Sequence, residues 1–245
     1  MDITRDDRVR MERAHVLAWP ALNTETIDGW LWRSSGGGSQ RANSVSTIDF
    51  HDTDLDGSIT KVEARYQALG HPVRFQTFDE TSPQSLPDTL RRRGYAESEA
   101  TITMFKRAVD AGMPSDVEVR DHAWPEWRSV YLGEITESRR AVNALILDRI
   151  PTPSAFFGCQ RTGEIIATAL CVVGFGCAVI ECVATRGDKR RQGAAQSVLT
   201  ALETWAAKQT AAWIGLQVVA SNTPAITLYE RLGFVASATN CFWVR

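Results

Sequence analysis

The feature that most constrains this chain is a basic turn, TRGDKRRQGAAQ, which spans Thr185–Gln196. An apolar segment that predicts a buried strand, Ala178–Thr185, precedes the turn, and Ala194–Lys208 carries its apolar residues on one helical face. A helix that begins after such a turn presents unpaired backbone N–H groups and the positive end of its dipole. Gly193 allows close approach of a ligand, and Lys189–Arg191 add positive charge. The turn therefore predicts a phosphate site, with a solvated turn as the alternative.

Charge and motif content narrow the choice of ligand. The turn lacks the GxGxxG and GxxxxGK[ST] patterns, so it predicts neither a dinucleotide-binding Rossmann unit nor a P-loop. The net charge of −2 divides into 16 basic and 23 acidic residues in 1–138, and 11 basic and 6 acidic residues in 139–245. The basic excess of the second part favours an anionic ligand there, whereas a nucleic-acid surface would need a basic stripe. We expect no nucleic-acid partner.

The cysteines and the N-terminus bear on the compartment. The five cysteines are odd in number, all lie in the second half of the chain and show no C-x-x-C spacing. This pattern is typical of reduced, buried thiols, and no metal is expected. The first fifteen residues are too charged for a signal peptide, and Glu181 follows the longest apolar run, which Gly174 and Gly176 interrupt. We expect a cytoplasmic protein without a membrane partner.

The two parts of the chain repeat one order of elements. In the second part we expect strands at 154–158, 164–173 and 178–185, a helix at 194–208, a strand at 213–219, a helix at 223–231 and a strand at 238–244. In the first part we expect a helix at 9–17, a hairpin of strands 29–33 and 41–46, a helix at 58–69, a strand at 73–78, a helix at 85–93 and a strand at 100–105. The run 75–78 with Gly94-Tyr95 echoes 216–219 with Gly233-Phe234, which predicts an internal duplication. Any unit of strand, helix, glycine and strand would look similar, which is the alternative.

Two motifs in the second part resemble the GCN5-related N-acetyltransferase (GNAT) superfamily. The run Arg190–Ala195 fits the [Q/R]-x-x-G-x-[G/A] pyrophosphate loop of that superfamily. About thirty residues later, Asn222, Ala225, Tyr229 and Gly233-Phe234 fit its second cofactor segment. The resemblance covers roughly residues 139–245. It implies an α/β (α+β) GNAT fold, with a mixed central β-sheet flanked by helices and two GNAT-like repeats.

The resemblance implies acetyl-CoA as co-substrate. Backbone groups of Val183, Ala184 and Thr185 and the side chain of Asn222 would contact the pantetheine arm, and the strands that end near Thr185 and Val219 would splay apart to admit it. Ala225 and Tyr229 belong to the same cofactor segment. The backbone amides of the turn would hold the pyrophosphate, and the residues concerned are Arg190, Arg191, Gln192, Gly193, Ala194, Ala195 and Gln196.

Acetyl transfer to an amine needs a base and an acid, because the amine must lose a proton and the departing thiolate must gain one. By resemblance, Tyr229 is the acid; a packed aromatic is the alternative. Glu181 is the predicted base, since it is the carboxylate within the apolar strand; an edge-facing or salt-bridged carboxylate is the alternative. Cys182 is interpreted as a core residue, because no histidine lies near it in sequence and the superfamily usually transfers the acetyl group directly.

The first part resembles the N-terminal half of bacterial tandem-GNAT proteins, in degenerate form. We expect a degenerate GNAT-like domain at 1–112, a linker or first element at 113–138 and the catalytic GNAT domain at 139–245. The resemblance implies that the first domain forms a wall of the acceptor pocket. The candidates to face that pocket are Trp30, Trp32, Arg41 and Asn43, although buried support is the expected role of each tryptophan.

An acidic segment, Asp52–Glu63, competes with this interpretation. It satisfies the pattern D-x-[DN]-x-[DN]-G-x5-E of an EF-hand calcium loop. The context disagrees, because an EF-hand needs a preceding helix and a strand is predicted there. The alternative is an acidic turn whose Asp56 or Ser58 caps the following helix. Its carboxylates would repel a pyrophosphate, so the first repeat is not expected to bind CoA.

Together these patterns predict an acetyl-CoA-dependent N-acetyltransferase that modifies a primary amine of a small molecule or peptide by direct attack. The alternative is a non-catalytic protein that senses acetyl-CoA or calcium. The acidic first part mildly favours cationic or zwitterionic acceptors. The acceptor itself is not specified by the sequence, and the chain is expected to be a monomer or homodimer.

Overall fold

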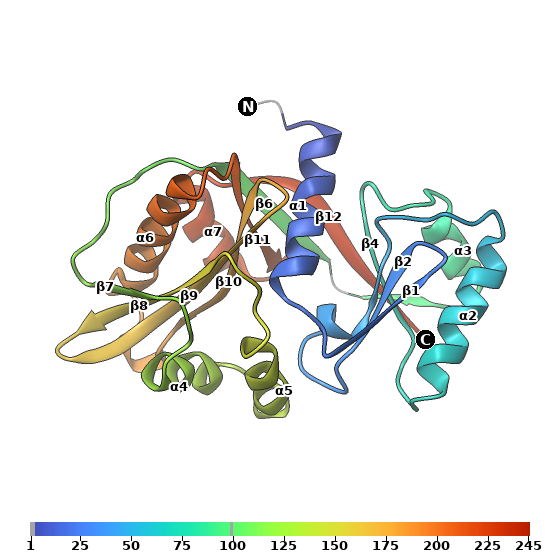
Figure 1. Ribbon diagram of the computed structural model, residues 1–245, viewed down its shortest axis with the longest axis horizontal. Helices are drawn as coiled ribbons and strands as arrows, with labels where there is room; N and C mark the ends of the chain where they lie inside the picture. The colour runs from blue at the N-terminus through green and yellow to red at the C-terminus, as the bar shows by residue number, and fades with distance from the viewer. Residues whose placement is uncertain (1–2, 99) are drawn as a thin grey trace.

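The computed structural model describes residues 3–98 and 100–245. Its strands form one mixed sheet in the order β1-β2-β3-β4-β12-β6-β11-β10-β9-β8-β7, with β5 (Ala96–Glu97) paired to β12. Helices cover both faces of this sheet (Figure 1). The predicted mixed central sheet flanked by helices is confirmed.

The first repeat forms one end of the sheet. Its elements are β1 (Asn23–Ile27), β2 (Trp30–Ser34), β3 (Val45–Ser46), α2 (Leu55–Gln67), β4 (Arg74–Phe78) and α3 (Leu86–Arg92). Strand β2 is antiparallel to both β1 and β3, while β3 and β4 are parallel. Trp30 and Trp32 are buried in the core between this sheet and its helices. Both tryptophans therefore support the fold and do not face a pocket.

The second repeat has the same order of elements. These are β8 (Ser154–Arg161), β9 (Glu164–Gly174), β10 (Cys177–Thr185), α6 (Ala194–Lys208), β11 (Trp213–Val219) and α7 (Thr223–Arg231). Strand β10 is parallel to β11, as β3 is to β4. An additional strand, β7 (Val117–Arg120), extends the edge beside β8.

The two repeats exchange their last strands. Strand β6 (Thr101–Arg107) follows the first repeat in sequence but pairs with β11 of the second. Strand β12 (Val235–Val244) ends the second repeat but pairs with β4 of the first. The C-terminus consequently lies beside α2, at the far end of the molecule from α6 (Figure 1). The predicted tandem repeat is confirmed, and its halves share one continuous sheet.

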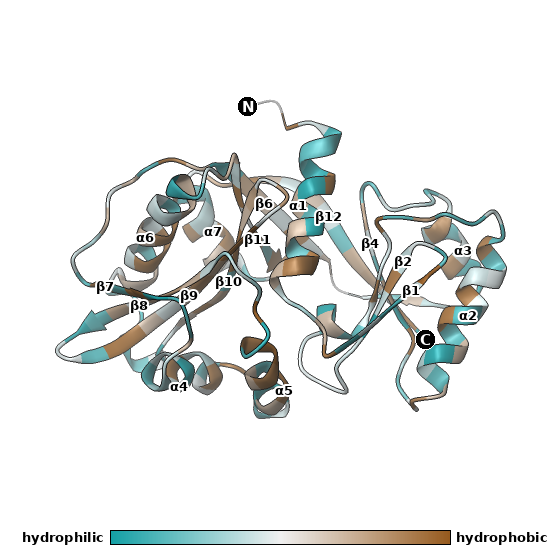
Figure 2. Cartoon of the chain, viewed as in Figure 1, coloured by the Kyte–Doolittle hydropathy of each residue, from teal (hydrophilic) through white to brown (hydrophobic). Residues whose placement is uncertain are grey.

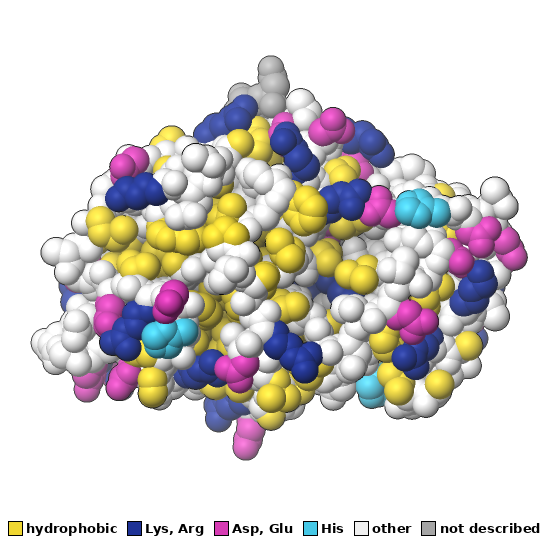
Figure 3. Space-filling model, viewed as in Figure 1, with side chains coloured by type: hydrophobic (Ala, Val, Ile, Leu, Met, Phe, Trp, Pro, Cys, Tyr) yellow, Lys and Arg dark blue, Asp and Glu magenta, His cyan; other side chains and the backbone are white. Residues whose placement is uncertain are grey.

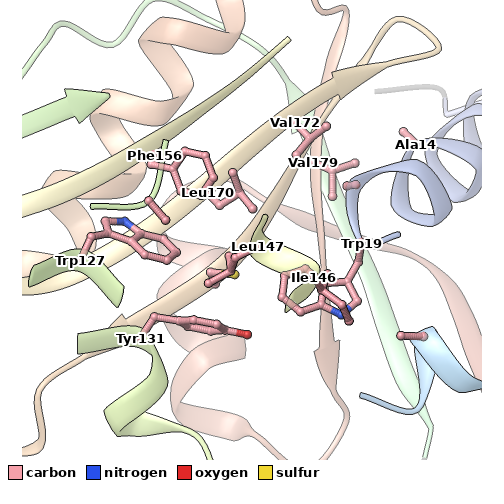
Figure 4. Packing of buried hydrophobic residues seen from close by; sticks show 14 of the residues in the cluster. Ala14, Trp19, Trp127, Tyr131, Ile146, Leu147, Phe156, Leu170, Val172 and Val179 are labelled. Carbon is pink, nitrogen blue, oxygen red and sulfur yellow. The ribbon is translucent and has the colours of Figure 1, made fainter. Parts of the chain in front are cut away.

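Three helices cover one face of the second repeat. They are α1 (Arg5–Ala18), α4 (Pro125–Glu134) and α5 (Glu137–Leu147), and α6 and α7 cover the opposite face. Figure 4 shows how the first group packs, with Trp127, Tyr131 and Ile146 against strand residues such as Leu170 and Val179. A capping box between Thr4 and Asp7 begins α1. The helix is hydrophilic at that end and hydrophobic toward its C-terminal end (Figure 2).

Helix α1 bears on how the chain divides. It lies within residues 1–112 but packs on β9, β10 and β11 of the second repeat. Segment 113–138 contains β7 and α4, which pair with β8 and pack on β9. The division at residues 112 and 139 stays a prediction. Both α1 and β6 lie before residue 112 in the chain but contact strands of the second repeat.

One predicted strand is wrong. Of the segment 41–46, only Val45–Ser46 is a strand, and Arg41–Asn43 forms a 3₁₀ turn. The hairpin partner of β2 is β1, with the tight turn at Asp28-Gly29, while β2 meets β3 only at Leu31 and Ser46. The reason is that the glycine loop between β2 and β3 does not turn tightly but extends away to contact α5.

The surface carries charges of both signs. On the face shown in Figure 3, basic and acidic side chains are interspersed and form no stripe of one sign. In the described part of the chain, no helix has both the length and the apolar character needed to cross a bilayer. On this face, the electrostatic potential at a bound ligand is therefore set by the few charged residues nearest to that ligand.

Candidate active site

Strands β10 and β11 separate partway along their length. They pair only from Cys177 to Val179, opposite Trp213 to Gly215. Beyond these residues β10 continues to Thr185 and β11 to Val219 without further pairing between them. The strands thus open toward the basic turn, in the arrangement that the resemblance implies.

The basic turn keeps its backbone amides free. It runs from a short 3₁₀ segment, Gly187–Lys189, to α6, and the first α6 bond joins the Ser197 amide to the Gly193 carbonyl. Among the described residues, none of the amides from Arg191 to Gln196 donates to a protein acceptor. Gly193 has a φ of +79° at the N-cap and supplies no side-chain cap. The turn therefore has the free donors that an anion needs.

The charged side chains of the turn lie at its rim. Arg190 is exposed and donates to Glu134 of α4 at 2.8 Å, and Glu134 also accepts from the Gly187 amide at 2.9 Å. Arg191 has a φ of +61°, which is uncommon for a residue with a side chain. Gln192 is exposed beside it. Glu134 thus fixes the start of the turn from the neighbouring helix.

Strand β10 has a bulge where it leaves β11. The pairing with β9 shifts register between Glu181 and Ala184, so Cys182 and Val183 stand outside the ladder. Cys182 has a φ of +54°, and its carbonyl accepts from the Thr168 hydroxyl at 3.0 Å. Val183, Ala184 and Thr185 are half-buried along the opened edge. These three residues lie where the backbone could meet a ligand arm between the strands.

Asn222 and Ala225 begin α7. The Asn222 side-chain oxygen accepts from the Ala225 amide at 3.3 Å, so the residue is the N-cap of the helix. Its side-chain NH₂ group makes no hydrogen bond with the described residues. Asn222 can therefore cap the helix and still donate to a ligand.

Tyr229 lies on α7 and is buried. Its ring packs on Phe234 with the centroids 6.0 Å apart, within the core below α6. Burial raises the pKa of Tyr229 to about 12, and the negative charge of Glu181 adds to this effect. Desolvation and the charge of Glu181 are the only influences on this hydroxyl among the described residues, and no hydrogen bond contributes. The hydroxyl therefore stays protonated and available as a donor at neutral pH.

Glu181 is held by an arginine of the first repeat. Its two oxygens accept from the two terminal nitrogens of Arg41, each at 2.6 Å. On the other side, Nδ1 of the buried His15 lies 3.9 Å from the carboxylate. Strand alternation explains the position, because Glu181 shares the face of Cys177 and Val179, which α1 covers.

This ion pair sets the protonation of Glu181. Burial alone raises the pKa, but the charge and hydrogen bonds of Arg41, with His15 as a smaller contribution, lower it to about 2. A carboxylate with such a pKa is a weak base. The predicted role of Glu181 as general base stays a prediction, and it requires that Arg41 first release the carboxylate.

A cavity of about 540 Å³ lies between the repeats, next to this pair. The first repeat contributes the loop 38–41, α5 contributes Ser138 and Arg139, and the sheet contributes Thr101, Gln217, Val219 and Phe242. Arg41 therefore lines this cavity, and its predicted place beside the acceptor stays a prediction. Asn43 lies in the neighbouring surface hollow, where its side chain donates to the carbonyl oxygen of Ser39 and so supports the loop.

The acidic turn of the first repeat is organised differently from the basic one. Asp54 is the N-cap of α2 and accepts from the Gly57 amide at 2.9 Å, and Asp52 accepts from the amides of Thr53 and Asp54. The carboxylates of this turn thus accept from amides near the start of α2, whereas the corresponding amides at the start of α6 have no protein acceptor among the described residues. The predicted cap was Asp56 or Ser58, and the residue that caps is Asp54. Within residues 3–98 and 100–245, no cluster of three or more His, Cys, Asp or Glu side chains could hold a metal ion.

Three residues around the site have no signal in the sequence. They are His15 beside Glu181, Glu134 beside the basic turn and Arg139 in the cavity. Each reaches the site from a helix that is distant in sequence from β10 and the basic turn. An alignment that showed these positions to be invariant could have found them.

The fold and the site agree with the comparisons to known proteins. The model of the family described as "Probable histone acetyltransferase Rv0428c C-terminal" matches residues 7–241. The chain belongs to this family of acetyltransferases. It is also 28% identical over 239 residues to the uncharacterized N-acetyltransferase YobR of Bacillus subtilis (strain 168), with 94% of this chain and 95% of YobR covered.

Solved structures place the fold in the GNAT superfamily. A GCN5-related N-acetyltransferase from Kribbella flavida superposes with a TM-score of 0.71 at 15% identity, covering 96% of this chain and 94% of that chain. A tandem GNAT protein from the clavulanic acid biosynthesis pathway superposes with a TM-score of 0.64 at 11% identity, covering 98% and 95%. Because the match to the tandem protein covers 98% of this chain, the similarity of fold extends over both repeats.

Proposed function

We propose that this protein transfers an acetyl group from acetyl-CoA to a primary amine of a small molecule or peptide. The observation that carries the proposal is the run of free amides from Arg191 to Gln196, at the point where β10 and β11 separate. An uncapped helix start with a basic rim fits a pyrophosphate, and the opened strands fit a narrow arm that extends from it.

We propose the following contacts for the co-substrate. The amides of Arg191–Gln196 hold the pyrophosphate, with Arg190 at the rim. Backbone groups of Val183, Ala184 and Thr185 at the bulge contact the pantetheine arm. The free NH₂ group of Asn222, at the start of α7 with Ala225, contacts the arm from the opposite side. Acetyl-CoA supplies an activated acetyl group, and the protein supplies its orientation.

In the proposed reaction the neutral amine attacks the thioester carbonyl, so that a C–N bond forms, the C–S bond breaks and the nitrogen loses one proton to the base. Tyr229 donates its hydroxyl proton to the departing thiolate. The high pKa of Tyr229 suits this role, because the proton stays on oxygen until negative charge develops nearby. We propose direct transfer because burial raises the pKa of the Cys182 thiol well above its usual value, which suppresses the thiolate needed for a covalent step.

Glu181 remains our proposed base under one condition. An acceptor ammonium group that enters the cavity competes with Arg41 for the carboxylate, and Glu181 can accept a proton only after Arg41 leaves. His15 lies 3.9 Å from Glu181 on a buried helix face. The pair Arg41–Glu181 thus links the first repeat to the chemistry of the second.

Two measurements test the proposal. Titration calorimetry with acetyl-CoA should detect binding, and Gly193→Ala should raise the Kd about tenfold, which is about 1.4 kcal/mol, because a methyl group crowds the anion. Gly94→Ala is the matched control, since Gly94 has a φ of +82° and, like Gly193, no heavy atom within 4 Å of an added Cβ. An equal loss of affinity for acetyl-CoA in both variants would contradict the proposed pyrophosphate site.

Thiol release from acetyl-CoA with a panel of amines tests the reaction. Release above the hydrolysis background is the expected result. Tight binding of acetyl-CoA without release for any amine would instead indicate a sensor of acetyl-CoA.

A further inference from the structure

The cavity between the repeats contains one arginine that no acidic side chain of the described residues neutralises. Two of its lining residues are arginines, and none is acidic. Arg41 is neutralised by Glu181. The side chain of Arg139, in contrast, makes no ion pair or hydrogen bond with any described residue, and its Nε is buried without a partner. A buried guanidinium atom without an acceptor is costly, so this position favours an anion from outside the protein.

The surroundings of Arg139 strengthen this preference. Arg139 lies in the first turn of α5, and the N-cap Thr136 makes no side-chain cap, so the amides of Glu137 and Ser138 have no acceptor among the described residues. Ser138 also lines the cavity and adds a hydroxyl donor. Ser138 and Arg139 thus line the cavity at the start of α5, where the positive end of the helix dipole also favours an anion.

The Arg139 end of the cavity lies near the residues that we propose for acetyl transfer. Arg139 is close enough to Cys182 for its charge to act on that thiol, and Cys182 is in the bulge beside Glu181. Gln217 of β11, beyond the point where the strands separate, lines the same cavity. An acceptor held at Arg139 therefore has its other end near Glu181 and the opened strands.

We infer that the acceptor is an amine that also carries an anionic group, a carboxylate or a phosphate, which binds Arg139 and the start of α5. This inference rests on the proposed acetyl transfer and names its substrate class. It also narrows the cationic or zwitterionic acceptors that the net charge of the sequence favours. The acidic residues of the first part do not line the cavity, whereas a zwitterionic acceptor fits both Glu181 and Arg139.

The test compares matched acceptors in the wild-type protein. The probes are γ-aminobutyrate, O-phosphoethanolamine and the amide of γ-aminobutyrate, which keeps the amine but lacks the carboxylate. We expect the KM of an anionic acceptor to be at least about tenfold below that of the amide, the effect of a charged hydrogen bond. Preference for the carboxylate or the phosphate identifies which anion the site takes. Equal KM values for the acid and the amide, with both acetylated, would overturn the inference but not the proposed function.

Variants then assign the effect to Arg139. Arg139→Gln should raise the KM of the anionic acceptor about 10- to 100-fold and leave that of the amide within about twofold. Arg139→Lys should retain part of the preference, because it keeps the charge. Arg140→Gln is the control, since Arg140 is exposed on the same helix turn and donates to the Gly133 carbonyl. An equal loss for acid and amide in Arg139→Gln would show a structural role and overturn the inference.

A binding measurement separates the two proposals. Calorimetric titration of γ-aminobutyrate, O-phosphoethanolamine and the amide into the protein saturated with CoA needs no turnover. Binding of an anionic probe that Arg139→Gln abolishes supports the inference even if no acetylation follows, in which case the proposed function fails alone. Absence of binding by both anionic probes to the wild-type protein would count against the inference.

Discussion

Gln76 and Gln217 donate their side-chain amides to the two oxygens of one buried carboxylate, that of Glu12, at 3.2 and 3.0 Å. The two glutamines occupy equivalent positions in β4 and β11, the strands that the internal duplication relates. Asn240 of the exchanged strand β12 donates to the same carboxylate at 2.9 Å. Glu12, on the shared helix α1, therefore joins both repeats at the centre of the sheet.

Glu12→Gln should lower the free energy of unfolding by about 2–4 kcal/mol, because an amide NH₂ would face the donors of Gln217 and Asn240. Urea denaturation measures the change. Glu25→Gln is the control, since Glu25 forms an exposed pair with Arg65, and its loss should cost less than about 1 kcal/mol. Similar costs in the two variants would contradict a central role for Glu12.

Gly38→Ala should disturb the wall of the cavity. An added Cβ would lie 2.8 Å from the Asn143 side-chain oxygen and 3.0 Å from Val142, at a φ of +77°. We expect a loss of about 1–3 kcal/mol in the free energy of unfolding, and a higher KM for the acceptor with an unchanged Kd for acetyl-CoA. Gly36→Ala has a φ of +69° but no neighbour within 4 Å, so it controls for backbone strain alone. Equal effects of the two substitutions on the KM would show that contact with α5 is irrelevant.

The Arg41–Glu181 pair predicts a dependence of stability on pH. The pKa of Glu181 in the folded protein is about 2, below its ordinary value of 4.5. The resulting stabilisation is therefore present above about pH 4.5 and is lost as the pH falls toward 2. It should amount to roughly 3 kcal/mol at most, from 1.36 kcal/mol per pKa unit.

Urea denaturation from pH 7 to pH 3 checks this expectation. The difference in free energy of unfolding between the wild type and the double variant Arg41→Gln/Glu181→Gln should shift in favour of the variant as the pH falls below about 4.5. The double variant is preferable to either single one, which would leave a buried charge unpaired. Parallel pH profiles would contradict the low pKa of Glu181.

Tyr229→Phe should reduce kcat by about 10²- to 10⁴-fold, the usual contribution of a positioned acid, and leave the Kd for acetyl-CoA nearly unchanged. Because the pKa of Tyr229 is about 12, no loss of activity from its ionisation should occur below pH 10. Steady-state thiol release measures both expectations. Tyr131→Phe, which removes a buried hydroxyl that accepts from Asn143, is the control. A similar kcat for Tyr229→Phe and wild type would exclude the acid role.

Asp54→Ala should lower the melting temperature by an amount that calcium does not change. Asp54 is the cap of α2, and loss of such a cap costs about 1 kcal/mol. Millimolar calcium should leave the melting temperature of the wild type where it is. A calcium-dependent increase that Asp54→Ala abolishes would restore the EF-hand interpretation.

Local patterns in the sequence determined much of the fold. Predicted helices at 194–208 and 223–231 and the strand at 213–219 match α6, α7 and β11 residue for residue. Their apolar periodicity and terminal residues are properties of consecutive positions, so they can be read without the fold. The basic turn and its helix were predictable for the same reason.

Tertiary structure alone decided how the repeats combine. The exchange of β6 and β12, the packing of α1 on the second repeat and the pairing of Arg41 with Glu181 all join residues far apart in the chain. An arginine in a loop has no local pattern that names its partner, and a glutamate in an apolar strand shows only that some partner is needed. Which charges neutralise each other, and that Arg139 is left without an acceptor, depends on contacts formed only after the chain has folded.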